Sequence, residues 1–218
     1  MAGIGFELKK VFRGGSIFAV LRGYSLAAVV TEGPMVLMIV LLLTLQQLLA
    51  AFGTPYRVRE QFLFFMTYAM IFSLLLAGTV LLFLDRFISD CIYEQRLQQV
   101  LPAFYGVVFF LLLVGAPAAG LYLLTLPVGN GVRLAAELLF CVLLVVWVQM
   151  SYLSAVKRYE YVLLGFVGGT VTALVLAWVF LRAGAEPLAA ALWGAALGFL
   201  VLLFLYMGQI LALSLIHI

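Results

Sequence analysis

Long apolar stretches separated by short polar connectors dominate the pattern of this 218-residue chain. A helix needs about 20 consecutive apolar residues to cross the hydrocarbon core of a bilayer, and six stretches meet that length. We therefore predict an all-α, polytopic membrane fold whose consecutive helices run antiparallel, because the connectors are short. The predicted spans form one transmembrane lobe over residues 16–213 and cover residues 17–52, 61–84, 102–126, 134–156, 161–181 and 187–213.

The first span is too long for one upright helix. Its 36 residues would extend about 54 Å at about 1.5 Å per residue, whereas the hydrocarbon core is about 30 Å thick. Proline removes a backbone donor and clashes with the preceding turn, so Gly33-Pro34 predicts a bend near the middle of this span. Residues 1–15 are a predicted cytoplasmic segment, in which residues 4–13 form a short amphipathic helix on the membrane surface.

Composition supports a membrane environment and predicts the orientation. Hydrophobic residues make up 67% and charged residues 10% of the chain, and the mean hydropathy is +1.26, whereas about 25% of residues are charged in a soluble domain. The net charge of +3 is too small and too scattered to indicate a nucleic-acid partner. Eight of the 12 Lys and Arg fall on the N-terminal side of the predicted spans: Lys9, Lys10, Arg13, Arg22, Arg86, Arg96, Lys157 and Arg158. The positive-inside rule therefore places the N-terminus in the cytoplasm.

Few residues are suited to catalysis, metal binding or disulfide formation. Cys91 and Cys141 cannot build a disulfide framework. The single histidine, His217, is the penultimate residue of the chain, so a metal site of the usual His and Cys type is not expected. No nucleophile–base arrangement and no glycine-rich phosphate loop is present in the sequence. We therefore expect no enzyme activity and no cofactor.

Two charged residues inside the first span are the leading candidates for a transport site. Arg22 and Glu32 lie ten residues apart, which is close to three helical turns, so they could share one face. A charge in hydrocarbon costs roughly 2.5–3.5 kcal/mol even on lenient scales, which favours a position facing protein or a water-filled cavity. Beside the break at Gly33 and Pro34, Glu32 could bind a proton or a cation. In the structural alternative, Arg22 extends to the interface and Glu32 is capped by a neighbouring helix.

The fourth span carries the other candidate residues. Glu137 lies near its outer end, where a position at the membrane interface is the simpler interpretation. Gln149, Ser151, Tyr152 and Ser154 form a polar and aromatic group near its cytoplasmic end. Such a group could contact a sugar chain, and hydrogen bonding between helices is the alternative.

Charged residues in the connectors are interpreted as cytoplasmic anchors. Arg86 and Asp90 are four residues apart and could pair on a helix surface. Lys157 and Arg158 occupy a tight connector between two spans.

Glycines recur at a spacing of four in the last two spans. Gly165 and Gly169 share one predicted helix, and Gly194 and Gly198 share the next. Small residues at this spacing let helix backbones approach closely. We expect packing within the bundle, with an oligomer interface as the alternative.

Several stretches of the sequence resemble the PelG family, the inner-membrane transporter of the Pel exopolysaccharide system. The resemblance extends over nearly the whole chain up to the sixth span, and its most specific parts are the opening decapeptide and the stretch Trp147–Lys157. The matching stretches are Met1–Lys10, Leu21–Tyr24, Glu32–Pro34, Arg86–Asp90, Val100–Gly106 and Trp147–Lys157. Asp85 departs from the family pattern, in which an uncharged residue precedes the arginine.

The resemblance implies a place in the superfamily of multidrug and oligosaccharide-lipid flippases, whose members have about twelve helices in two lobes. This chain would then be the N-terminal lobe, and residues 214–218 a non-native tail. The implied function is export of a Pel-like, amino-sugar-rich exopolysaccharide across the cytoplasmic membrane for biofilm formation. Its implied partners are a cytoplasmic glycosyltransferase, other membrane subunits and the lipid bilayer.

Two other functions stay open at this point. The chain could export a different substrate, or it could be a membrane scaffold that holds a glycosyltransferase without transporting anything. A scaffold should tolerate neutralisation of Arg22 and Glu32, whereas a transporter should not.

The orientation can be tested by cysteine labelling. Arg57→Cys and Arg133→Cys should react with a membrane-impermeant thiol reagent applied to intact cells, because both positions are predicted to lie outside. Labelling that occurs only after permeabilisation would reverse the assigned orientation.

Overall fold

The computed structural model describes residues 17–156 and 159–216, with side chains described over residues 33–212 except 92, 97 and 159. Within these residues the chain is all-α and contains no strand. Six long helices are present: α2 (Ile17–Ala51), α3 (Tyr56–Tyr93), α4 (Val100–Leu124), α5 (Asn130–Ala155), α6 (Tyr159–Arg182) and α7 (Pro187–Ile216). A short 3₁₀ helix, η1 (Leu97–Gln99), precedes α4. All six helices are long and apolar enough to cross a membrane, which confirms the predicted six-span, all-α fold.

Two of the reversals between helices use the same glycine-terminated cap. Gly53 and Gly184 follow α2 and α6 with φ of 71° and 79°, a conformation that glycine adopts without steric cost. After each glycine the chain turns back to the helix, so that the Thr54 amide donates to the Leu49 carbonyl and the Ala185 amide to the Phe180 carbonyl, both at 3.1 Å. This pairing satisfies carbonyl groups that a helix end would otherwise leave unpaired.

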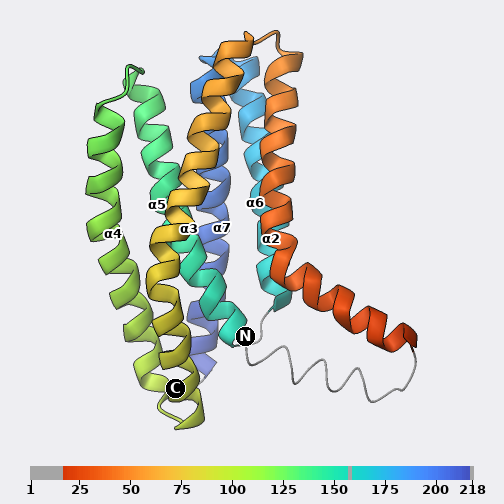
Figure 1. Cartoon of the computed structure of the whole chain (residues 1–218), viewed down its shortest axis with the longest axis vertical. Helices are drawn as coiled ribbons and strands as arrows, with labels where there is room; N and C mark the ends of the chain where they lie inside the picture. Colours follow the sequence, from red (N-terminus) through yellow and green to blue (C-terminus); the bar gives the residue numbers. More distant parts are fainter. Residues whose placement is uncertain (1–16, 157–158, 217–218) are drawn as a thin grey trace.

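The helices run up and down in an antiparallel bundle, so that α2 begins and α7 ends at the same end (Figure 1). Helix α5 lies at its centre. Eight consecutive residues, Val142 to Gln149, are buried, and more than two turns of a helix can be buried on every side only if other helices surround it. The neighbours of α5 are α3, α4, α6 and α7.

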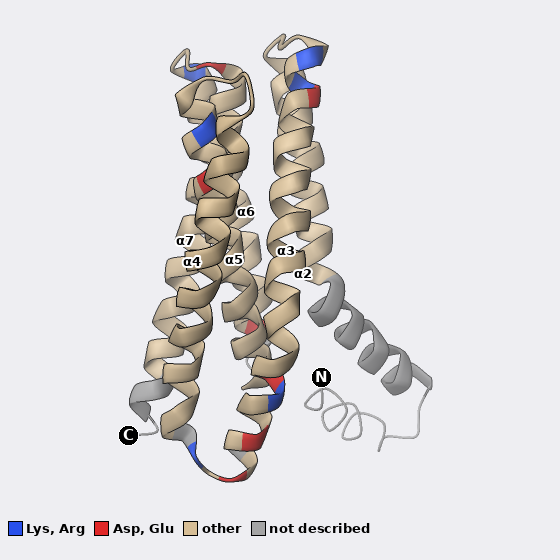
Figure 2. Cartoon of the chain, turned by 60° about the vertical axis from the view of Figure 1, so that its left-hand side comes forward, with Lys and Arg blue, Asp and Glu red and all other residues tan. Residues whose placement is uncertain are grey.

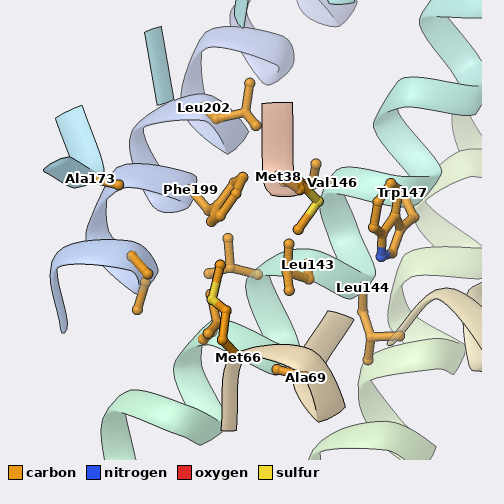
Figure 3. Packing of buried hydrophobic residues seen from close by; sticks show 14 of the residues in the cluster. Met38, Met66, Ala69, Leu143, Leu144, Val146, Trp147, Ala173, Phe199 and Leu202 are labelled. Carbon is orange, nitrogen blue, oxygen red and sulfur yellow. The ribbon is translucent and has the colours of Figure 1, made fainter. Parts of the chain in front are cut away.

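The centre of the bundle is filled by apolar side chains. Met38 from α2, Met66 from α3, Leu143 from α5 and Phe199 from α7 are all fully buried and meet in the middle (Figure 3). Charged residues lie mainly toward the two ends (Figure 2). Apolar side chains therefore fill most of the bundle between its two charged ends.

Helices α6 and α7 approach each other most closely at the four glycines. A Cβ added to Gly194 or Gly198 would lie 2.7 Å from the Ala177 Cβ or 2.5 Å from the Ala173 Cβ, and Gly165 lies against Tyr206 in the same way. The expectation that these glycines serve packing within the bundle is thereby confirmed.

The structure differs from the sequence-based boundaries in the second helix. The predicted spans 61–84 and 102–126 leave the residues between them as a connector, but α3 continues through its first part to Tyr93. The helix persists because hydrogen bonds within a helix do not depend on the membrane. The exposed ion pair of Arg86 and Asp90, one turn apart at 3.1 Å, adds a small contribution.

The proline that predicted a bend in the first span lies inside the first helix of the structure. Pro34 lies inside α2, and the ribbon of α2 bends partway along its length (Figure 1), as expected where a proline removes a helical hydrogen bond. The predicted surface helix over residues 4–13 lies outside the described residues.

A substitution at Gly198 should loosen the α6–α7 contact. Gly198→Ala places a methyl group within 2.6 Å of the Ala173 backbone, and such overpacking costs about 1–3 kcal/mol. We expect a lower midpoint of thermal unfolding in detergent. The matched control is Gly208→Ala on the same helix, where an added Cβ meets nothing within 4 Å and the midpoint should hold or rise. Equal midpoints for the two variants would contradict the packing role of Gly198.

Candidate functional site

The residues of α2 that sequence analysis singled out lie at the edge of the described region. The side chains of Arg22 and Glu32 are outside the described residues, so their role stays a prediction. Gly33 is half-buried and Pro34 is buried. Helix α2 packs mainly along α6, so the proline faces protein.

Glu137 is seated against a glycine of the neighbouring helix. Its half-buried side chain lies over Gly120 of α4, where an added Cβ would be 3.1 Å from the Glu137 Oε1 atom. Arg133, one turn earlier on α5, is engaged elsewhere: it donates to the Leu126 carbonyl at 2.8 Å and to the Asn130 side chain at 3.2 Å. Among the described residues Glu137 has no ion-pair partner. The carboxylate therefore lies at a helix–helix contact with no basic side chain paired to it among the described residues.

Polar side chains along α5 bond to two different helices. The Trp147 indole N–H donates to the Ser73 hydroxyl of α3 at 3.0 Å. The fully buried Gln149 donates its Nε2–H to the Leu203 carbonyl of α7 at 3.1 Å, and its Oε1 atom has no partner among the described groups.

One turn further along α5, Ser151 and Tyr152 also contact neighbouring helices. The Ser151 hydroxyl donates to the Asp85 carboxylate of α3. Tyr152 is buried, and its ring meets Phe104 of α4 edge-on, with centroids 5.5 Å apart. Hydrogen bonding between helices, one of the two interpretations of this polar group, is therefore what the structure shows for Gln149 and Ser151.

The predicted candidates do not converge on one site. Glu137 and Gln149 are twelve residues apart on α5, which is about 18 Å along the helix. Gln149 faces α7, whereas Tyr152 faces α4. Among the anchors, Arg86 and Asp90 form their exposed pair at the end of α3, and Lys157 and Arg158 lie outside the described residues.

Three contacting residues were not predicted as partners from the sequence. Ser73 and Gly120 are single small residues in apolar stretches, and nothing in their surroundings in the sequence distinguishes them. Asp85 stood out only as a charged residue at an unexpected position. The signal for the bond to Ser73 lies at its other end, at Trp147. A tryptophan buried in a bundle usually finds a hydrogen-bond acceptor.

Comparison with known proteins gives one match. Residues 1–213 match the family model PelG, described as "putative exopolysaccharide exporter (EPS-E)". No curated protein and no solved structure matches the chain. The match covers almost the whole sequence, the six apolar helices fit a multi-pass membrane protein, and the chain belongs to the PelG family of exopolysaccharide exporters.

Proposed function

We propose that this chain is one six-helix lobe of a twelve-helix exporter that moves an amino-sugar-rich, Pel-like exopolysaccharide across the cytoplasmic membrane. The observation that carries the proposal is the match to the exporter family over residues 1–213, supported by the six helices long enough to span a membrane. In this proposal the chain works beside a cytoplasmic glycosyltransferase and other membrane subunits of a biofilm polysaccharide complex.

The packing of the bundle bears on the proposed route of the polymer. A sugar chain carries many hydroxyl groups, and each would lose hydrogen bonds in an apolar interior. The bundle centre is closed by side chains such as Met38, Leu143 and Phe199, and the inward polar groups of Gln149 and Ser151 are bonded to other helices. We therefore assign the route to an outer face of this lobe, where a second lobe would complete a water-filled passage.

Rigid packing supports a mechanism of alternating access. Transporters of this general kind move one repeat against the other as bodies of nearly fixed shape. Here α6 and α7 are locked at Gly194 and Gly198, and α5 is bonded to α3 and α7 through Trp147 and Gln149. A lobe held in this way can rotate as one unit without losing its internal contacts.

Glu32 is the residue that we propose to sense positive charge. It precedes the buried Pro34 in α2, and carboxylates beside interrupted helices form cation sites in several transporters. The cation would be either a coupling ion or the amino group of the polymer. Arg22 lies ten residues, or nearly three helical turns, before Glu32. It would place a positive charge on the same helix.

The scaffold function is supported by a different observation. Trp147, Gln149 and Ser151 in the centre of the bundle donate hydrogen bonds to neighbouring helices, as they would in a protein that only holds a glycosyltransferase. The charge of Glu32 distinguishes the two functions, because a transporter needs this charge and a scaffold does not.

Glu32→Gln in the complete exporter keeps the shape of the side chain and removes its charge. We expect polymer export to fall about tenfold or more, which corresponds to about 1.4 kcal/mol of lost stabilisation. Secreted polymer would be measured by carbohydrate assay and normalised to the exporter detected in membranes.

Glu186→Gln is the matched control, because Glu186 is exposed in the turn before α7 and export should be unchanged. Full export by Glu32→Gln at normal protein level would remove Glu32 from the mechanism and favour the scaffold.

A further inference from the structure

An apolar groove opens between α3 and α4, with α5 as its floor. Its volume is about 590 Å³, within the range of about 300–1,000 Å³ typical of small-molecule sites. The deepest part of the lining is buried and includes Ala69 of α3, Leu123 of α4 and Ala136 of α5, whereas Phe72 and Tyr122 at the edges are exposed. The groove is thus a lateral opening on the side of the bundle.

The walls of the groove are apolar and differ in size. On the α3 side, Phe64, Tyr68 and Phe72 stack one turn apart, with ring centroids 4.4 and 5.5 Å apart. On the α4 side, Ala118 and Ala119 leave the space that larger side chains would fill. Bulky side chains on one helix thus face small ones on the other, and the groove lies between them.

Little in the groove would hold water. The Thr79 hydroxyl already donates to the Leu76 carbonyl at 2.7 Å. The other hydroxyl groups of the lining belong to Tyr68 and Tyr122, both at exposed edges. A buried water needs two to four polar partners, so the floor favours an apolar occupant.

The surroundings of the groove are hydrocarbon. All three helices that form it are long and apolar enough to cross the membrane, and its lining on α3 begins eight residues inside the helix, at Phe64, and ends at Thr79. This stretch extends about 22 Å at about 1.5 Å per residue, most of the hydrocarbon thickness of about 30 Å. The molecules that reach this opening are lipids and other membrane helices.

The shape of the groove favours a lipid chain over a helix. A volume of about 590 Å³ along a stretch of about 22 Å gives a mean cross-section of roughly 26 Å² for the centres of water-sized molecules, and roughly 60 Å² once their radius of about 1.4 Å is added. A helix with its side chains is about 10 Å across and needs roughly 80 Å². An extended hydrocarbon chain is about 4–5 Å across, because carbon atoms in contact lie about 3.5–4.0 Å apart. The groove therefore fits a chain of methylene groups.

We propose that this groove binds an acyl chain of a membrane phospholipid, which fills the space between α3 and α4. Where α3 and α4 are too far apart to touch, the bound chain contacts both helices. It thereby holds α4 against the bundle. The proposal depends on the membrane-spanning helices and not on the proposed export function, so either can fail without the other.

The test is retention of lipid by the purified chain, measured by native mass spectrometry in octyl glucoside with added palmitoyl-oleoyl phosphatidylethanolamine. We expect the unaltered chain to retain this phospholipid. Ala119→Phe, which places a ring in the groove, should reduce the retained fraction at least fivefold. Val171→Phe is the matched control, because Val171 is 54% exposed on α6, outside the groove, and retention should be unchanged.

Thr79→Phe fills the groove from the α3 side and gives the same readout if Ala119→Phe does not fold. Added phospholipid should also raise the thermal midpoint of the unaltered chain and of Val171→Phe more than that of the groove variants. Equal retention by the groove variants and the control would overturn the proposal. A chain that holds no lipid but forms dimers that Ala119→Phe disrupts would also overturn it and assign the groove to a second copy.

Discussion

Helices surrounded by lipid gain little hydrophobic stabilisation from contacting one another, because the acyl chains outside are as apolar as the side chains inside. The architecture of this bundle follows from that constraint. Its helices must be held by close contact and by hydrogen bonds, and both are concentrated on few residues. Gly194 and Gly198 bring the backbone of α7 against α6, while Trp147, Gln149 and Ser151 bond α5 to α3 and α7.

The central position of α5 determines which polar groups remain for function. A helix surrounded by protein over the run Val142–Gln149 cannot present polar side chains to a passing polymer without opening the bundle. Trp147, Gln149 and Ser151 bond α5 to its neighbours instead, and the Gln149 Oε1 atom, buried without a partner among the described groups, costs some free energy. Glu137 differs because it is half-buried in a notch at Gly120. An ionisable group inside a membrane segment without an opposite charge is a functional candidate on physical grounds.

Local patterns in the sequence predicted what depends on local structure. The six helices follow from apolar stretches of sufficient length, the pair Arg86–Asp90 from a spacing of four, and the α6–α7 contact from glycines at the same spacing. The end of α3 at Tyr93 was not predictable from hydropathy, because a helix continues past the membrane boundary wherever its own hydrogen bonds remain favourable. The partners of Gln149 and Ser151 depend on how each helix is rotated about its axis, and rotation is set by neighbours far away in the sequence. No local pattern gives the notch at Gly120 for the same reason.

The groove between α3 and α4 shows how the same constraint acts where packing is incomplete. In a soluble protein an open apolar groove of this size would expose hydrocarbon to water and would tend to close. In a membrane that driving force is absent, so two helices can diverge and leave the space to lipid. Helix α4 is the least enclosed of the six, with 17% of its most apolar window buried against 61% for α5. Less of α4 than of α5 is therefore fixed by contacts within the described bundle. The bundle thus combines a centre in which α7 is packed against α6 and bonded to α5 with one peripheral helix, α4, beside an apolar groove, and the acyl chain proposed for that groove would support this helix from outside.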